Sequence, residues 1–188
     1  NKPGTKIKNL KGGAIGGSLI QGKFSVGDEI EIKPGILNGK KKSYEPIQTE
    51  IVSLGTSAGT VDNVKPGGLV AIGTKLDPSL SRSDSLLGSV IGKPGTLPEN
   101  STVSKLEINL FDTAVGTQGD TKVMPVQVGE LLRVNIGAAP VPAKVNKAKA
   151  DDIEIEFRRP VCLFTGGNVA LSRRISERWR LIGAGVVV

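Results

Sequence analysis

The 188-residue sequence has no histidine, a single cysteine and only six aromatic residues. Without histidine, neither a serine or cysteine triad with a histidine base nor a metal site with histidine ligands can be built. Cys162 cannot form an internal disulfide, and the apolar run around it predicts a buried thiol rather than a nucleophile. A lone cysteine is also typical of a reducing compartment, and we therefore expect a cytoplasmic protein.

Long apolar runs are absent as well. No stretch approaches the ~20 apolar residues of a membrane-spanning helix, so we expect no membrane partner. The small number of aromatic side chains disfavours a single-stranded nucleic-acid binder that works by stacking bases. These two absences leave a binding surface that is mainly polar or charged.

The charge balance is basic, with a formal net charge of +7. Residues 1–93 hold 13 Lys and Arg against 8 Asp and Glu, and residues 94–188 hold 12 against 10. Such a surface favours a polyanionic partner, although it can also serve solubility alone. If the partner is RNA, we expect contacts to its phosphate backbone to dominate.

The chain is cut into short segments by 25 Gly and 11 Pro. Between them lie runs typical of β-strands, at residues 27–32, 47–52, 69–72, 105–111, 131–136 and 153–157. In the first and last of these runs Glu alternates with Ile, which predicts one exposed face and one buried face. Many short strands of this kind predict an all-β fold, either a barrel or a sandwich. Two prolines and two glycines within residues 92–101 predict a boundary, giving domains 1–93 and 94–188.

Catalytic chemistry finds little support in the sequence. The one near-match to a phosphate loop, residues 17–23, is followed by Phe24 where such a loop needs Ser or Thr. A phosphate loop also opens a helix, whereas this segment enters a predicted β-hairpin. The carboxylates are scattered along the chain. We therefore expect no enzyme activity, no metal and no cofactor in this chain.

Basic residues cluster at 40–42, at 158–159 and, most densely, at 173–180. Alternation along a strand places Arg173 on the same face as Ile175 and Trp179, together with Leu171 and Leu181. Four apolar neighbours predict that this face points inward, so Arg173 should be partly buried and paired. Arg174, Arg178 and Arg180 should then face outward. A turn at residues 176–177 would reverse the alternation after it.

Four segments, in consistent order, resemble the two antiparallel β-barrels that follow the G domain in translational GTPases such as elongation factor Tu. They are residues 15–32, 65–73, 93–96 and 180–187. Within that superfamily, the strings Gly73–Pro78 and Trp179–Gly183 are most similar to the gamma subunits of archaeal and eukaryotic initiation factor 2. The resemblance spans essentially the whole chain.

The resemblance implies a fragment made of the second and third domains of such a factor. Its GTP, magnesium and GTPase activity would belong to a G domain that this chain lacks. The complete factor would deliver methionyl initiator tRNA to the small ribosomal subunit. The family pattern implies tRNA contacts at Gly67, Gly68, Lys75 and Arg82.

For the alpha subunit of the same factor, we expect docking at Lys40, Lys41, Lys42 and Tyr44. Two alternatives stay open. The barrels could belong to another tRNA-delivering elongation factor, such as the selenocysteine-specific one. The chain could also be a non-catalytic, β-rich ribosomal or RNA-associated structural protein.

Overall fold

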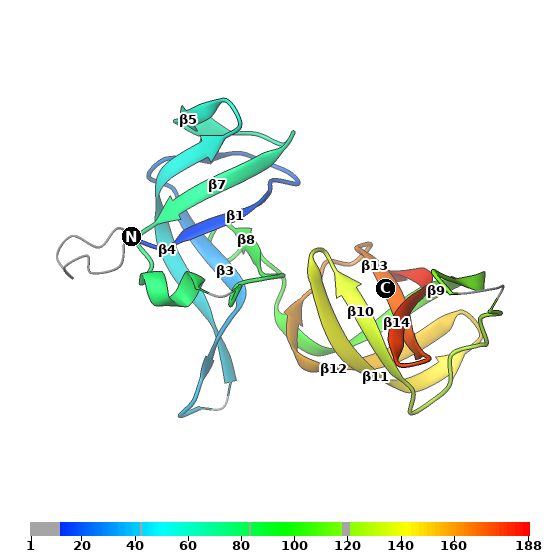
Figure 1. Cartoon of the computed structure of the whole chain (residues 1–188). Helices are drawn as coiled ribbons and strands as arrows, with labels where there is room; N and C mark the ends of the chain where they lie inside the picture. The colour runs from blue at the N-terminus through cyan, green and yellow to red at the C-terminus, as the bar shows by residue number, and fades with distance from the viewer. Residues whose placement is uncertain (1–11, 42, 83, 118–120) are drawn as a thin grey trace. The chain divides into compact units, whose positions relative to one another are not determined.

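The computed structural model describes residues 12–41, 43–82, 84–117 and 121–188. The chain divides into two compact units, Asn1–Leu97 and Pro98–Val188. The predicted boundary between residues 93 and 94 lies four residues ahead of this division. Figure 1 shows that both units consist of strands. The predicted all-β, antiparallel fold is thus confirmed: within the described residues the only helix is a single short 3-10 turn, η2 (Pro78–Ser81).

The first unit is a curled, six-stranded antiparallel sheet in the order β1-β7-β4-β3-β8, with β5 pairing with β4. Its strands are β1 (Ala14–Ser18), β3 (Glu29–Asn38), β4 (Ser43–Thr56), β5 (Gly59–Val61), β7 (Leu69–Thr74) and β8 (Val90–Gly92). A separate two-stranded ribbon is formed by β2 (Phe24–Ser25) and β6 (Asn63–Val64).

The second unit is a closed antiparallel barrel in the order β10-β11-β12-β9-β14-β13. Its strands are β9 (Asn100–Val115), β10 (Leu131–Ile136), β11 (Ala139–Lys149), β12 (Asp152–Cys162), β13 (Asn168–Ile175) and β14 (Arg178–Val187). Closure pairs each of these six strands on both sides, so none of the six is an edge strand. No helix in the described ranges has the length and apolar character needed to cross a membrane.

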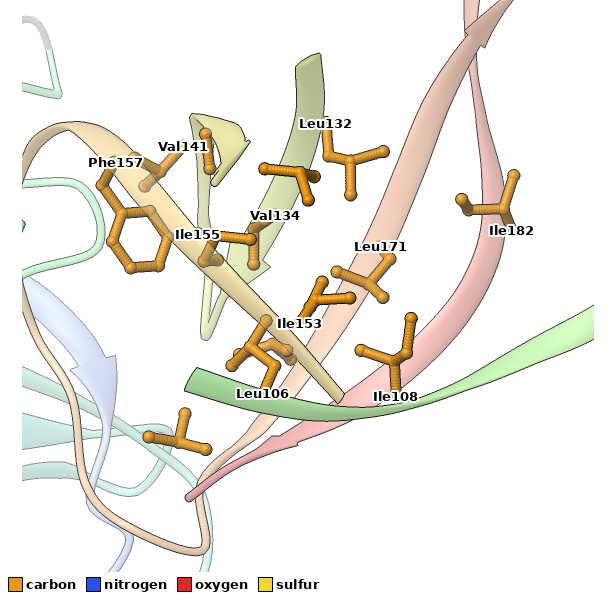
Figure 2. Close-up of a cluster of buried hydrophobic side chains, with 14 of the residues drawn as sticks. Leu106, Ile108, Leu132, Val134, Val141, Ile153, Ile155, Phe157, Leu171 and Ile182 are labelled. Carbon is orange, nitrogen blue, oxygen red and sulfur yellow. The ribbon is translucent and has the colours of Figure 1, made fainter. Parts of the chain in front are cut away.

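Alternating side chains build the core of the barrel. Figure 2 shows Leu106, Val134, Ile155, Leu171 and Ile182 gathered in its interior, each from a different strand. Along β11 the residues are alternately buried and exposed from Ala139 to Val145, as expected for a sheet with one solvated face. Cys162 is buried, as predicted.

The core of the first unit has two parts. One gathers Ile30, Ile51 and Leu54 from the central strands, and the other packs Ile32 and Ile47 beneath the segment that carries η2. The predicted burial of the isoleucines in this strand is therefore confirmed.

Glu31, which lies between these isoleucines, departs from the prediction of an exposed carboxylate. It is buried, and its Oε2 accepts a hydrogen bond from the Gly95 amide at 3.3 Å. The Lys33 ammonium, also buried, donates to the Leu97 carbonyl at 3.4 Å. The turn at residues 93–97 therefore covers the face of β3 that alternation alone would leave open.

A bend in β3 directs the β3–β4 hairpin. The pairing with β4 is irregular between Ile32 and Ile36, and Gly35 lies inside this irregularity with φ +87°. A Cβ at this position would lie 1.8 Å from the Glu45 carbonyl oxygen. Only glycine fits such a close approach of two backbones. Beyond the bend, the hairpin tip projects from the sheet (Figure 1).

The β13–β14 hairpin departs from the predicted strand alternation. Ser176 and Glu177 have φ of +47° and +63° and form a two-residue turn, so Ile175 pairs directly with Arg178. Directly paired residues share a sheet face, which places Arg180 beside Arg173 and Trp179 beside Arg174.

The prediction that Trp179 and Leu181 share the inward face with Arg173 is therefore wrong. So is the prediction that Arg178 and Arg180 lie on the opposite face, since they share the face of Arg173. The pairing has a second irregularity, because Leu171 pairs with Gly183 and Ser172 with Leu181. Ile182 is therefore an additional, unpaired residue of β14, and its side chain is buried. The predicted partial burial and pairing of Arg173 is confirmed, because its guanidinium binds the Glu130 carboxylate.

Candidate functional site

The two candidate glycines lie directly ahead of β7, with their backbones open to solvent. Gly67 has φ +141° and Gly68 +159°, and nothing lies within 4 Å of the place where a Cβ would stand. Both amide planes can therefore be approached closely by a ligand.

The same end of the sheet exposes two large apolar side chains. Leu69 is 76% exposed and Ile20 is 83% exposed. They lie near each other because Ser18 pairs with Leu69 between β1 and β7, and Ile20 follows two residues beyond this pair. Sequence reasoning missed these two residues. The one available signal was the position of Leu69 directly after the Gly67–Gly68 pair, and nothing in the sequence marks Ile20.

Lys75 and Arg82 lie beyond the opposite end of β7. Six strand residues span ~20 Å, so the structure does not bring the two glycines together with Lys75 and Arg82 (Figure 1). The Lys75 ammonium forms an ion pair with Glu50 at 2.5 Å. Arg82 follows η2 and is exposed. The two glycines are thus separated from Lys75 and Arg82, the other two residues predicted to contact tRNA.

A shallow hollow of about 490 Å³ is lined in part by Lys75. Its lining includes Glu29 and Glu50, which pair directly across β3 and β4, and Asp77, which caps η2. The Ser79 amide donates to Asp77 Oδ1 at 2.8 Å, and this bond holds the pKa of Asp77 below its ordinary value. The charged residues of its lining are acidic apart from Lys75, and so the hollow suits a cationic group better than a phosphate.

The hairpin tip, predicted to dock a subunit, presents ordered positive charge. Asn38 Oδ1 accepts hydrogen bonds from the Lys40 and Lys41 amides at 3.0 and 3.3 Å, which fixes the turn. Glu45 accepts from the Lys41 ammonium at 2.7 Å and from the Asn38 amide group at 3.0 Å. These two bonds, the first being the stronger influence, lower the pKa of Glu45, and Glu45 in turn raises the pKa of Lys41.

Apolar side chains lie next to this charge. Tyr44 is half-buried and pairs with Leu37, which is exposed together with Ile36. The structure therefore brings Lys40, Lys41 and Tyr44 together on one hairpin. Lys42 lies outside the described residues.

The structure does not form a nucleotide-binding loop from the near-match at residues 17–23. Gly17 and Ser18 belong to β1, and Phe24 is buried in β2, so no helix follows the loop. A phosphate loop needs a helix start and a hydroxyl for magnesium, and neither fits these residues. Among the residues that the structure describes, no group of carboxylates and cysteine is placed to hold a metal ion.

Both units are antiparallel β structures, and the second closes into a barrel. The family model described as "Initiation factor eIF2 gamma, C terminal" matches residues 102–187. The "Translation initiation factor 2 subunit gamma" of Methanocaldococcus jannaschii is 48% identical over the whole chain, and that of Pyrococcus furiosus is also 48% identical.

The corresponding subunit of Methanopyrus kandleri is 47% identical over the whole chain. In each case the chain spans 46% of the relative's own length. The chain belongs to the family of initiation factor 2 gamma subunits and corresponds to their carboxy-terminal part.

Proposed function

We propose that this chain is the part of a cytoplasmic translation initiation factor that helps to bind methionyl initiator tRNA for delivery to the small ribosomal subunit. The observation that carries this proposal is the open backbone of Gly67 and Gly68 at the end of the sheet that also exposes Ile20 and Leu69. Free amide groups suit the sugar and phosphate of a nucleotide, and the apolar pair suits a ribose or base face.

The net charge of +7 supports the proposal, since it attracts a polyanion. Lys75 and Arg82 would contribute a second contact beyond the other end of β7, where Lys75 would have to leave Glu50. GTP, magnesium and hydrolysis would belong to a separate G domain of the longer factor, so this chain contributes binding.

We also propose that the β3–β4 hairpin tip docks the alpha subunit of the factor. Lys40 and Lys41 offer charge, and Leu37 and Tyr44 offer apolar surface beside it. Exposed apolar residues rimmed by charged ones are typical of a protein contact.

One crossed experiment tests both proposals in the complete factor. Leu69→Asp should weaken binding of methionyl initiator tRNA at least tenfold and leave the alpha subunit bound. Leu37→Asp should weaken binding of the alpha subunit. When the factor is assembled with its alpha subunit beforehand, this variant should bind tRNA with an affinity within twofold of the unmodified factor. Both side chains are mostly exposed, so neither change should unfold the unit. Equal effects of the two variants on both partners would contradict the assignment.

The selenocysteine-specific elongation factor remains the alternative to test. The 48% identity to initiation factor subunits favours the initiator tRNA. A competition assay between methionyl initiator tRNA and selenocysteinyl-tRNA on the complete factor separates the two. Preference for the second tRNA would overturn the initiation role.

A further inference from the structure

The tip of the β3–β4 hairpin holds the only Asn-Gly dipeptide of the sequence, Asn38-Gly39. The backbone nitrogen that follows an asparagine lies within reach of the side-chain amide carbon of that asparagine, and ring closure between the two is an intramolecular step. Gly39 carries no side chain that would shield its nitrogen, and it is exposed. Apart from its chain neighbours, no atom lies within 4 Å of the place where its Cβ would stand. The approach to the Gly39 nitrogen is therefore open.

Two hydrogen bonds at the tip act on the carbonyl that this nitrogen would attack. Asn38 Oδ1 accepts from the Lys40 amide at 3.0 Å and from the Lys41 amide at 3.3 Å. When a nucleophile adds to an amide carbon, negative charge develops on the amide oxygen, and backbone amides directed at that oxygen stabilise the charge. The bonds that order the turn therefore also assist attack at Asn38.

The basic residues after the dipeptide favour the same step. Attack requires the Gly39 amide to lose its proton, and hydroxide is the base that removes it. Lys40 and Lys41 follow the glycine directly, and both are exposed. Positive charge attracts hydroxide and favours the deprotonated form of a neighbouring group.

We propose that Asn38 is a site of spontaneous deamidation. Hydroxide removes the Gly39 amide proton, the nitrogen forms a bond to Asn38 Cγ, and the Cγ–Nδ2 bond breaks as ammonia leaves with a proton from water. A second water molecule then opens the cyclic imide to aspartate or isoaspartate at position 38. The sum is hydrolysis of one amide to a carboxylate and ammonium, so water is the only co-reactant. The inference goes beyond the proposed function and depends on neither tRNA nor the alpha subunit.

The reaction would change the electrostatics of the hairpin. In the unmodified chain, Asn38 Nδ2 donates to Glu45 Oε2 at 3.0 Å, and the Lys41 ammonium binds the other oxygen of this carboxylate at 2.7 Å. In the aspartate product an anionic oxygen replaces the donor beside Glu45, and like charges repel. In the isoaspartate product the backbone itself is longer by a carbon atom. Both products therefore add negative charge to a basic tip.

The test is peptide mass spectrometry of the chain after incubation in mildly alkaline buffer. Digestion in acid, where hydroxide is scarce, preserves the deamidated fraction at each asparagine. Asn63 and Asn168 serve as internal references, because both are exposed and each is followed by valine, whose branched side chain shields the next amide. We expect Asn38 to deamidate at least tenfold faster than either reference, at a rate that rises with pH.

Gly39→Ala is the matched variant. The structure has room for the added methyl group, and the φ of Gly39 lies outside the left-handed region, so the variant should keep the urea midpoint of the unmodified chain. The methyl group shields the attacking nitrogen, and deamidation at Asn38 should become at least tenfold slower.

Asn38→Asp reproduces one product and tests its consequence. Without the Asn38 donor and with a second carboxylate nearby, the pKa of Glu45 should be higher in this variant than in the unmodified chain, as measured by a nuclear magnetic resonance titration. An unchanged pKa would contradict the proposed change at the tip.

Deamidation at Asn38 that is no faster than at Asn63 and Asn168 would overturn the inference. A rate that Gly39→Ala leaves unchanged would also overturn it. Both measurements use the chain alone, so failure here is distinguishable from failure of the proposed function.

Discussion

Arg173 and Glu130 form a two-pronged ion pair at one end of the closed barrel. The Arg173 Nε lies 2.5 Å from Glu130 Oε1, and the Arg173 Nη2 lies 3.1 Å from Glu130 Oε2. The guanidinium also donates to the Met124 and Pro125 carbonyls at 2.7 and 3.3 Å. This one side chain therefore fastens the irregular segment ahead of β10 to β13.

Replacing Arg173 by Ala should destabilise the barrel by about 3 kcal/mol, because the Glu130 carboxylate would lose its partner while remaining mostly enclosed. The two side chains are 17% and 19% exposed, so solvent can compensate only in part. Urea melts measure the effect. Arg178→Ala, at an exposed position of the same hairpin, should stay within about 0.5 kcal/mol. An equal or larger loss for Arg178 would show that the pair carries no stability.

Gly35→Ala should displace the β3–β4 hairpin, since a Cβ would stand 1.8 Å from the Glu45 carbonyl oxygen. Gly22→Ala is the control, because Gly22 has a similar φ of +81° but nothing within 4 Å of its Cβ position. We expect the Gly35 variant to lower the urea midpoint clearly more than the control and to weaken alpha-subunit binding. Equal urea midpoints for the Gly35 and Gly22 variants would mean that the close approach of Gly35 to the Glu45 carbonyl does not constrain the hairpin.

Alternation of apolar residues was enough to predict the strands and much of the core. Ile30 and Ile155, for example, are both buried as the pattern indicates. The pattern failed after Ser176, because a two-residue turn and an extra residue at Ile182 shift the faces of β14. Such shifts depend on turn conformation and on cross-strand pairing, which no single strand encodes.

Only part of the candidate site could be predicted from the sequence. The sequence names Gly67 and Lys75, and the strand predicted at residues 69–72 already puts them at its opposite ends, but the ion pair between Lys75 and Glu50 could not be predicted. The exposure of Ile20 and Leu69 could not be predicted, because it depends on which sheet face other segments leave uncovered. Glu31 is buried for the same kind of reason, since the turn at residues 93–97 covers it.

Acidification should loosen the hairpin tip. The pKa of Glu45 is lowered from its ordinary 4.5 by hydrogen bonds from Lys41 and Asn38. A lowered folded-state pKa gives stability that is present above pH 4.5 and lost as the pH falls through the lower, folded value. Hydrogen exchange at the Lys40 and Lys41 amides should therefore rise relative to other turns in that range. Glu45→Gln should abolish the pH dependence, and an unchanged pH profile in that variant would exclude Glu45 as its cause.

GTP should not bind to this chain. Residues 17–23 lead into strands, and Phe24 stands where a phosphate loop has Ser or Thr. Calorimetric titration with GTP and magnesium should give no binding heat at micromolar concentrations. Micromolar affinity would reveal a nucleotide site that the described fold does not contain.

The most direct test of the central claim is a titration of this chain with methionyl initiator tRNA at several salt concentrations. We expect weak binding that falls steeply with salt, with a slope in log K against log salt of about −0.7 to −0.9 for each phosphate that is neutralised. Leu69→Asp should weaken this binding further, whereas Leu37→Asp should not. Nanomolar affinity that is independent of salt, or binding that is unaffected by Leu69→Asp, would contradict the tRNA-binding role.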